Sequence, residues 1–227
     1  MNKYYHLLIG ILIGDFIVAS AHWFEDNYLY YDIKINIPIL SGIINDISKG
    51  NDMHHYVPRL ITQKSYLEAI MSTVKFLPIF LIVYLCIPRR TKTANIMIFL
   101  GISFMILISE ITHRWTHYRN CEKNNIIRLL QSTILVSSKE HNKHHTDEKA
   151  SRLYGVILKH SNKFYDFIGI WDLLESIIPN LCKKPNYFPN KPILEQCPYK
   201  MTEDEKNMYK QQLHEIRTKN KIPKCYT

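Results

Sequence analysis

The sequence contains no C-x-x-C pair, no glycine-rich phosphate loop and no internal repeat. Its 5 cysteines are odd in number and widely scattered. That pattern argues against a disulfide framework or a zinc ribbon, and it is typical of a chain whose soluble parts face a reducing compartment. A chain of 227 residues has room for one domain, and two domains would be crowded.

Hydrophobic residues are concentrated rather than abundant. The mean hydropathy is only −0.17 with 46% hydrophobic residues, so a membrane protein of this composition must gather them in blocks. Three blocks are present, and each approaches or exceeds the length that crosses about 30 Å of hydrocarbon at about 1.5 Å per residue. The last two flank a short basic turn, which predicts a helical hairpin through the membrane. The blocks are residues 4–23, 66–87 and 93–111, and the turn is 88–92.

Three further stretches bear on the organisation of the chain. The first block also fits a signal peptide cleaved after Ala21, although Asp15 interrupts its apolar core. Residues 126–136 are apolar but too short to span, which predicts a helix that lies in the interface or lines the site. Beyond residue 179 the chain turns polar, and residues 202–221 predict a surface helix or a partly disordered tail.

The net charge of +9 lies almost entirely in the second half of the chain. On charge alone a basic surface suits anionic lipid headgroups and nucleic acid equally well. The neighbouring apolar blocks favour lipid, so we expect a membrane and a phospholipid as partners and no nucleic acid.

Histidines form the most informative pattern. Of the 11 in the chain, eight fall into tight groups near the ends of the predicted spans. Imidazole suits iron, zinc and copper, but so large an all-histidine shell exceeds the four donors of a tetrahedral zinc site, which favours two metal ions. With three spans, all the groups emerge on one side of the membrane. The groups are His22; His54 and His55; His113 and His117; and His141, His144 and His145.

Helical spacing gives each group a common face, since residues three and four apart lie together on a helix. His113 and His117 can therefore bind one ion together, while the third residue of the last group can reach a second. Taken singly, each group has a plainer explanation as an interfacial anchor, a surface pair or a solvated turn. Their shared side favours a metal site over these explanations.

Four polar residues near this pattern are further candidates. Asp26 is four residues past His22 and could orient its imidazole. Asp15 and Glu110 are carboxylates within the apolar blocks, where such groups are functional candidates, although Glu110 fits a helix end at the interface equally well. His160 could be an extra ligand, but a surface position suits it better.

From residue 14 to residue 178 the chain resembles the Kua or plasmanylethanolamine desaturase family and its plant plastid relatives, which place a trans double bond in an acyl chain of phosphatidylglycerol. In three places it departs from the family pattern: Ala19 replaces a glycine, an Asn-Gly-Asp-Asn element is missing around residues 68–73, and Ser132-Thr133-Ile134 replaces Asp-Trp-His. The matching residues are Asp15-Phe16, His22-Trp23, Asp26, His54 to Pro58, His113 to His117, Leu129 to Gln131, His141 to His145, Asn162 and Gly169 to Trp171.

The resemblance implies a histidine-box desaturase with two non-haem irons, dioxygen as oxidant, and electrons from an external donor such as cytochrome b5 or ferredoxin. It adds Asp26 and Asn162 to the eight histidines as cofactor-binding residues. The substrate it implies is the alkyl ether chain of plasmanylethanolamine, which becomes the vinyl ether of a plasmalogen. Trans desaturation of an acyl chain and hydroxylation of a lipid remain alternatives, as does a non-catalytic metal-binding membrane protein.

We therefore expect an all-α fold, a multi-pass membrane bundle of three to four spans with a histidine-box cap. Residues 1–178 form the lipid desaturase domain and residues 179–227 a polar C-terminal tail. More lysines and arginines lie at the histidine ends of the spans than at the opposite ends, so the positive-inside rule places the site on the cytosolic side. In a eukaryotic host the membrane would be that of the endoplasmic reticulum.

Overall fold

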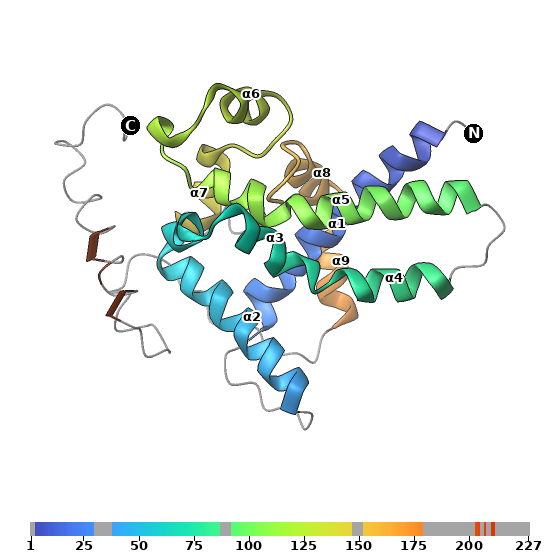
Figure 1. The fold of residues 1–227 in the computed structure, drawn as a ribbon, viewed down its shortest axis with the longest axis horizontal. Coiled ribbons are helices and arrows are strands. Elements are labelled where there is room, and N and C mark those ends of the chain that lie inside the picture. Colours follow the sequence, from blue (N-terminus) through green and yellow to red (C-terminus); the bar gives the residue numbers. More distant parts are fainter. Residues whose placement is uncertain are drawn as a thin grey trace.

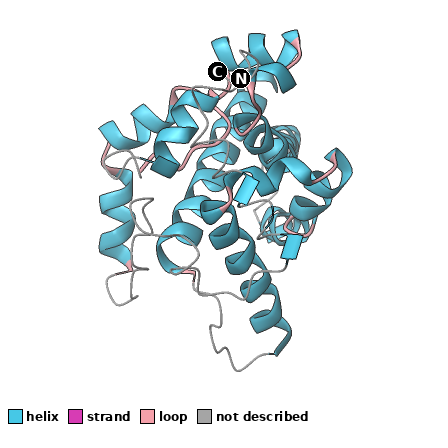
Figure 2. Cartoon of the chain, turned by 90° about the vertical axis from the view of Figure 1, so that its left-hand side faces the viewer, coloured by secondary structure: helices cyan, strands magenta, loops and turns pink. Residues whose placement is uncertain are grey.

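A computed structural model describes residues 3–29, 38–86, 92–146 and 152–178, together with 203–204, 207 and 210–211. Within these ranges the fold is helical, and the β-type pairing found there is an isolated bridge between Leu135 and Leu158. Figures 1 and 2 show the helices packed around one another without a sheet. The expected all-α class is therefore confirmed for the described residues. The elements are α1 (Lys3–Tyr28), α2 (Pro38–Tyr56), the 3-10 helix η1 (Pro58–Gln63), α3 (Tyr66–Val74), α4 (Leu77–Cys86), α5 (Lys92–Thr116), the 3-10 helix η2 (Asn120–Glu122), α6 (Asn125–Thr133), α7 (Ser138–Thr146), α8 (Ser161–Phe167) and α9 (Ile170–Ile177).

Helices α1 and α5 are the two described helices that are long and apolar enough to cross a membrane, judged by length and composition. They lie against each other in the centre of the fold. A Cβ atom on Gly101 would lie 2.6 Å from the carbonyl oxygen of Leu7, so the two backbones nearly touch at this point. Small residues at a helix crossing permit such close approach, which is a common way of packing helices in membranes.

The second apolar block is not one continuous helix. Helix α3 ends at Val74 and α4 begins at Leu77, with Lys75 and Phe76 in a turn between them. Pro78 accounts for the break because its ring would clash with the carbonyl of Val74, and it has no N–H to donate to that carbonyl. Helices of 9 and 10 residues are each too short to cross a bilayer alone. The block is therefore two short helices joined by a turn, and a membrane span over residues 66–87 stays a prediction.

The hairpin arrangement itself is present. Both α3 and α4 pack against α5, and Figure 1 shows α4 beside α5 on the same side of the molecule. The basic turn that joins them, residues 88–91, lies outside the described residues. Two candidate spans support a helical membrane protein, and the count of three to four stays a prediction.

Helix α6 occupies most of the short apolar stretch. Ile127 and Gln131 point into the protein, whereas Ile126 and Leu129 are exposed. An amphipathic helix with an apolar outer face fits the expected position in the membrane interface. Gln131 also donates from Nε2 to the carbonyl of Trp115, at 3.1 Å, which ties α6 to the end of α5.

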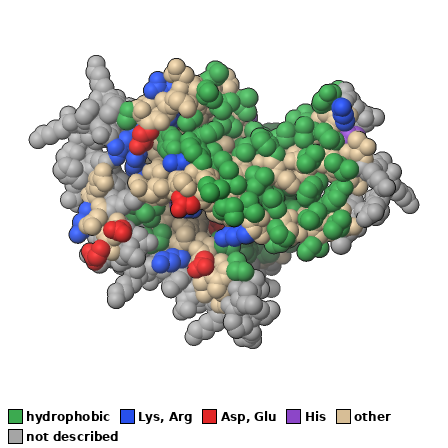
Figure 3. Space-filling model, viewed as in Figure 1, with side chains coloured by type: hydrophobic (Ala, Val, Ile, Leu, Met, Phe, Trp, Pro, Cys, Tyr) green, Lys and Arg blue, Asp and Glu red, His purple; other side chains and the backbone are tan. Residues whose placement is uncertain are grey.

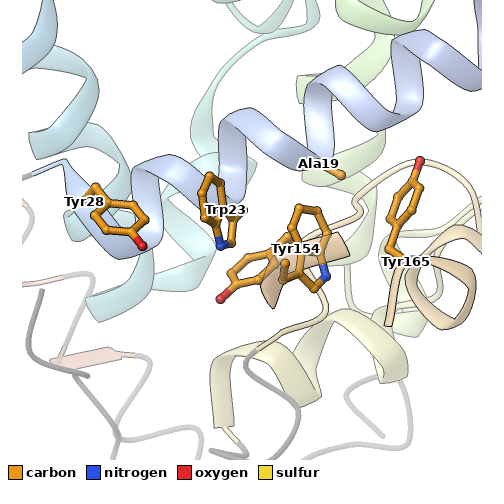
Figure 4. Close-up of a cluster of buried hydrophobic side chains, with 6 residues drawn as sticks. Ala19, Trp23, Tyr28, Tyr154 and Tyr165 are labelled. Carbon is orange, nitrogen blue, oxygen red and sulfur yellow. The ribbon is translucent and has the colours of Figure 1, made fainter. Parts of the chain in front are cut away.

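The segment from residue 154 to residue 178 folds back on α1 through aromatic packing. Trp23 stacks on Trp171 with ring centroids 6.1 Å apart, and Tyr154 and Tyr165 meet Trp171 edge-on at 5.0 and 5.7 Å. Figure 4 shows Tyr154 and Tyr165 beside the α1 side chains Ala19 and Trp23. Buried aromatic rings contribute much of a core's stability. This cluster therefore holds the C-terminal part of the described domain against α1.

Asp15 fastens the same segment at a second point. Its side chain is buried, and it accepts a hydrogen bond from the Leu158 N–H at 3.1 Å and another from the Tyr165 hydroxyl at 2.7 Å. A buried carboxylate needs such partners to offset the loss of water. The structure thus gives this candidate a role in holding the fold. Most of the predicted tail, residues 179–227, lies outside the described residues, and the few described there are helical and exposed.

Candidate metal centre

The eight predicted histidines come together from α1, α2, α5 and α7, with His117 directly after the end of α5. They sort into two neighbouring clusters, and within each cluster the possible ligand atoms lie within 4.8 Å of one another. Convergence of the groups at one end of the bundle, which the sequence predicts, is therefore present. We call the first the five-histidine cluster and the second the aspartate cluster. Their members are His54, His113, His117, His141 and His145 for the first, and His22, Asp26, His55 and His144 for the second.

Helix geometry explains how neighbouring residues serve different clusters. Successive residues of an α-helix point about 100° apart because the helix has 3.6 residues per turn. His54 and His55, at the end of α2, therefore diverge into the two clusters. Helix α7 does the same: His141 and His145, four apart, share one cluster, whereas His144 reaches the other. The sequence predicts which histidines come together, but it assigns the third histidine of α7, His145, to the second ion, whereas the structure places His144 there.

The five-histidine cluster has ring nitrogens at the spacing of metal ligands. His141 Nε2 lies 2.9 Å from His113 Nε2 and 3.1 Å from His145 Nε2. Two nitrogens bound at right angles to one ion, each at about 2.1 Å, would be about 3 Å apart. Both ring nitrogens of His54 and the Nε2 of His117 are buried without a hydrogen-bond partner. Buried nitrogens without partners are costly unless they bind something, so this cluster fits a metal ion.

The electrostatics keep these rings in the form that binds metal. Burial, followed by the proximity of the other imidazoles, lowers the pKa of His54, His141 and His145 well below the usual range. The same causes lower the pKa of His117 to about 3. The four rings are therefore neutral at pH 7, and a neutral imidazole offers a lone pair to a metal ion.

In the aspartate cluster, Asp26 lies among three imidazoles. One carboxylate oxygen, Oδ1, is 2.9 Å from His55 Nε2 and accepts a hydrogen bond from Asn51 Nδ2 at 2.8 Å. The other, Oδ2, is 3.1 Å from His144 Nε2 and 3.4 Å from His22 Nε2. Asp26 is thus close enough to join the ligand set, beyond the orienting role that its spacing from His22 indicates. Asn51 was not predicted, because nothing in its local sequence marks it.

The tautomer of His22 supports a metal ion here as well. His22 Nδ1 lies 2.9 Å from the carbonyl oxygen of Tyr154, which can only accept, so this nitrogen carries the hydrogen and donates it. In the neutral ring, Nε2 then presents a lone pair toward the carboxylate of Asp26. Two acceptors facing each other repel unless a cation, such as a metal ion, lies between them. A hydrogen bond from the second ring nitrogen to a carbonyl is also the usual way to fix a metal-bound histidine.

Asn162 supports the backbone near the clusters and belongs to neither of them. Its side chain is fully buried, its Nδ2 donates to the carbonyl of Gly155 at 2.9 Å, and its Oδ1 accepts from the Gly155 N–H at 2.7 Å. The structure therefore does not bring Asn162 to either cluster. Asn162 instead fixes the backbone at Gly155. The residue before it, Tyr154, contacts His22 through its carbonyl oxygen. The Tyr154 carbonyl was not predicted, because a backbone acceptor leaves no signal in residue types.

Two other candidates lie away from the clusters. His160 is exposed at the start of α8, as the surface explanation predicts. Glu110 pairs with Lys64, with its Oε1 2.6 Å from the Lys64 Nζ. It lines the cavity described below and is not part of either donor set.

The family model for the lipid desaturase domain matches residues 11–186, a range that includes both clusters. The chain belongs to this family. A probable fatty acid desaturase of Acanthamoeba polyphaga mimivirus is 24% identical over 189 residues, which cover 80% of this chain and 84% of that protein. No solved structure matches the chain. Membership of this family and similarity to the viral desaturase support a lipid-desaturating oxidoreductase. A histidine-rich metal centre suits that chemistry.

A cavity of about 720 Å³ lies beside the candidate metal centre of this lipid desaturase domain. It adjoins His22 of the aspartate cluster and both His54 and His113 of the five-histidine cluster. Its volume lies within the range of about 300–1,000 Å³ that ligand pockets occupy. Apolar side chains of α1, α4, α5 and the neighbouring segments form much of its wall, among them Ile17, Val18, Phe76, Phe80 and Ile106.

The surface of the domain also has an apolar part and a charged part. Figure 3 shows hydrophobic side chains gathered over the half of the visible face that α4 and α5 occupy, while charged side chains lie mainly over the other half. Large exposed apolar areas mark surfaces that contact lipid or other proteins. With the two long apolar helices, this division supports association with a membrane.

Proposed function

We propose that the protein is an oxygen-dependent desaturase with two iron ions, and that it converts the alkyl ether chain of plasmanylethanolamine to a vinyl ether. One observation carries this proposal: two buried donor clusters lie side by side at a largely apolar cavity. Membership of the lipid desaturase domain family supports the reaction type. The resemblance of the histidine motifs to plasmanylethanolamine desaturases supports the ether substrate.

The donor set fits iron. Five imidazoles in one cluster exceed the four donors of a tetrahedral zinc, and three imidazoles with a carboxylate suit iron in the other. Iron bound there would supply, with dioxygen and electrons from a donor such as cytochrome b5 or ferredoxin, the chemistry that removes two hydrogens from adjacent carbons. The residues that would hold it are the eight histidines and Asp26.

The protein's own contribution is to hold and position the chain. The apolar wall excludes water from the lipid chain and confines it beside His22, His54 and His113. The Tyr154 carbonyl fixes the orientation of His22. Correct placement of a reacting group is worth many powers of ten in rate, so small displacements of this wall would be costly.

We also propose where the reaction takes place. The excess of lysine and arginine at the histidine ends of the predicted spans favours a centre that faces the cytosol. In a eukaryotic cell this corresponds to the cytosolic face of the endoplasmic reticulum, which an antibody against an added terminal tag would test in selectively permeabilised cells.

Lipid analysis of cells that lack plasmanylethanolamine desaturase activity tests the function directly. Expression of the chain is expected to restore acid-labile plasmalogen, and His113→Ala, which removes a ligand of the five-histidine cluster, is expected to abolish it. Exposed His160 provides the matched control, so His160→Ala should retain the product. An iron-loaded, expressed protein that forms no vinyl ether would rule out this substrate.

A second candidate is trans desaturation of a phospholipid acyl chain. The viral relative named a probable fatty acid desaturase favours it. The same lipid analysis separates the candidates, because an acyl product has lost two hydrogens without becoming acid-labile, and a hydroxylase product has gained an oxygen. A zinc-filled protein that consumes no oxygen would instead favour a non-catalytic metal-binding role.

A further inference from the structure

The cavity beside the metal centre has charged side chains on its wall as well as apolar ones. The lysines are contributed by three separate parts of the chain: α2, the end of η1 and the turn between α3 and α4. Carboxylates from α1, α2 and α5 lie on the same wall, so the cavity is not simply a slot for a hydrocarbon. These residues are Lys49, Lys64 and Lys75, with Glu25, Asp46 and Glu110.

Two of the three lysines are available for a ligand. Lys64 is neutralised by Glu110, with its Nζ 2.6 Å from Oε1. Neither Lys49 nor Lys75 has an ion pair within the described part of the chain, and the Lys75 ammonium lies 5.4 Å from the centroid of the Phe76 ring. Lys49 and Lys75 therefore leave two ammonium groups on the cavity wall that can bind an anionic group of a ligand.

The break between α3 and α4 places one of these cations. Lys75 and Phe76 form the turn that separates the two helices, and both line the cavity with Ser72 and Thr73. The hydroxyls of Ser72 and Thr73 donate to carbonyls of their own helix, at 2.7 and 2.8 Å, so their hydrogens are already engaged. Non-helical backbone inside an apolar segment is tolerated where it lines a cavity, and interrupted helices often mark binding sites.

The other cation is tied to the metal centre. Lys49 precedes His54 by five residues on α2, about 7.5 Å along the helix axis. A group held by Lys49 would therefore fix the position of an attached chain relative to His54. Asp46 and Glu25 lie on the same wall and offset part of the positive charge, which suits a headgroup that carries charges of both signs.

We propose that Lys49 and Lys75 bind the phosphate of a phospholipid whose hydrocarbon chain occupies the cavity. This inference rests on the proposed function and names the residues that would hold the phosphate of its substrate, a group that a neutral lipid or a free fatty acid lacks. Lysine ammonium groups bind phosphate through charge-assisted hydrogen bonds, which are about twice as strong as neutral ones. The phosphate then holds the chain in register with the histidines.

Binding to the purified full chain in detergent, followed by native mass spectrometry, tests this without iron or turnover. Dioleoylphosphatidylethanolamine is expected to bind at least tenfold more tightly than dioleoylglycerol, which lacks the phosphate. The double variant Lys49→Ala, Lys75→Ala should lose this preference while its weaker binding of dioleoylglycerol is unchanged. Because no catalysis is measured, a failure here is distinct from a failure to form vinyl ether in cells.

Three controls make the result decisive. Lys163→Ala removes an exposed lysine of α8 that does not line the cavity, and it should bind like the unmodified protein. Lys49→Arg with Lys75→Arg keeps both charges and should retain the preference, even if the alanine variant folds poorly. Equal binding of both lipids, or an unchanged preference in the alanine variant, would overturn the proposal. Inorganic phosphate that binds the lysines as tightly as the lipid would assign them to a free ion and overturn it too.

Discussion

The ring of His22 is held by the carbonyl oxygen of Tyr154, 2.9 Å from Nδ1 and 132 residues away in the sequence. The side chain of Tyr154 accepts a hydrogen bond from Asn27 Nδ2 at 2.9 Å and packs against Trp171. One histidine of the aspartate cluster is thus oriented by a loop that the C-terminal aromatic packing and Asn162 keep in place.

Asn162→Ala should loosen that loop and weaken metal binding without removing a ligand. The change abolishes two buried hydrogen bonds to Gly155, which should cost about 1–3 kcal/mol of stability. Loss of second-layer support typically lowers metal affinity by about 10–100-fold. Thermal unfolding and iron titration measure the two effects. The neighbouring Lys163→Ala variant is the control, and unaltered iron affinity in Asn162→Ala would show that the loop does not position His22.

Substitution of His54 and of His55 should affect different ions. His54 belongs to the five-histidine cluster and His55 to the aspartate cluster, although they are adjacent in the sequence. Each alanine variant is expected to remove a ligand from one of the two ions and so change the spectrum of that iron, and His160→Ala should change neither, because His160 is exposed and away from both clusters. Iron content by mass spectrometry, with Mössbauer spectra of the two iron environments, provides the measurement. Identical spectral changes in both variants would contradict the division.

The metal-free protein should lose stability as the pH falls below about 6.5. Burial lowers the folded-state pKa of His117 to about 3, from a value of 6.5 in the unfolded chain. Between those values the unfolded state binds a proton that the folded state does not, so unfolding becomes more favourable as the pH falls. Each such group costs about 1.4 kcal/mol per pH unit, and the effect is absent above pH 6.5.

A substitution within the five-histidine cluster tests the cause of this acid sensitivity. His117→Gln removes one titrating group from the buried cluster, so the slope of the melting temperature against pH should become shallower below pH 6.5. His160→Ala, at the surface, should leave the slope as it was. A melting temperature that does not vary between pH 7 and pH 5 in the unmodified, metal-free protein would contradict the burial of these rings.

Gly101→Leu should disrupt the contact between α1 and α5. A Cβ at this position would meet the Leu7 carbonyl at 2.6 Å and backbone atoms of Gly10 and Ile11 nearly as closely, so the helices would have to separate. Overpacking of this kind costs about 1–3 kcal/mol. Gly42→Ala is the matched control, because no atom lies within 4 Å of a Cβ there. Detergent-based thermal unfolding compares the two, and equal melting temperatures would argue against the close crossing.

The sequence predicts the helical class and all eight histidines because both leave periodic or local signals: apolar blocks, and imidazoles three or four residues apart. It does not predict the division between clusters, since that depends on how α2 and α7 rotate relative to α1 and α5. It also misses the break at Lys75 and Phe76. A block with high hydropathy suggests a continuous helix, and the effect of Pro78 is local stereochemistry that an average over the block conceals.

Helices α2 and α7 each contribute ligands to both clusters. Neither helix can turn about its axis to improve its hold on one ion without moving the ligands of the other. Filling the five-histidine cluster would therefore fix the rotation of both helices and present His55 and His144 already aligned, so that the second ion binds without having to order its own ligands. Iron uptake should accordingly be cooperative, with half-loaded molecules scarce at every stage of filling.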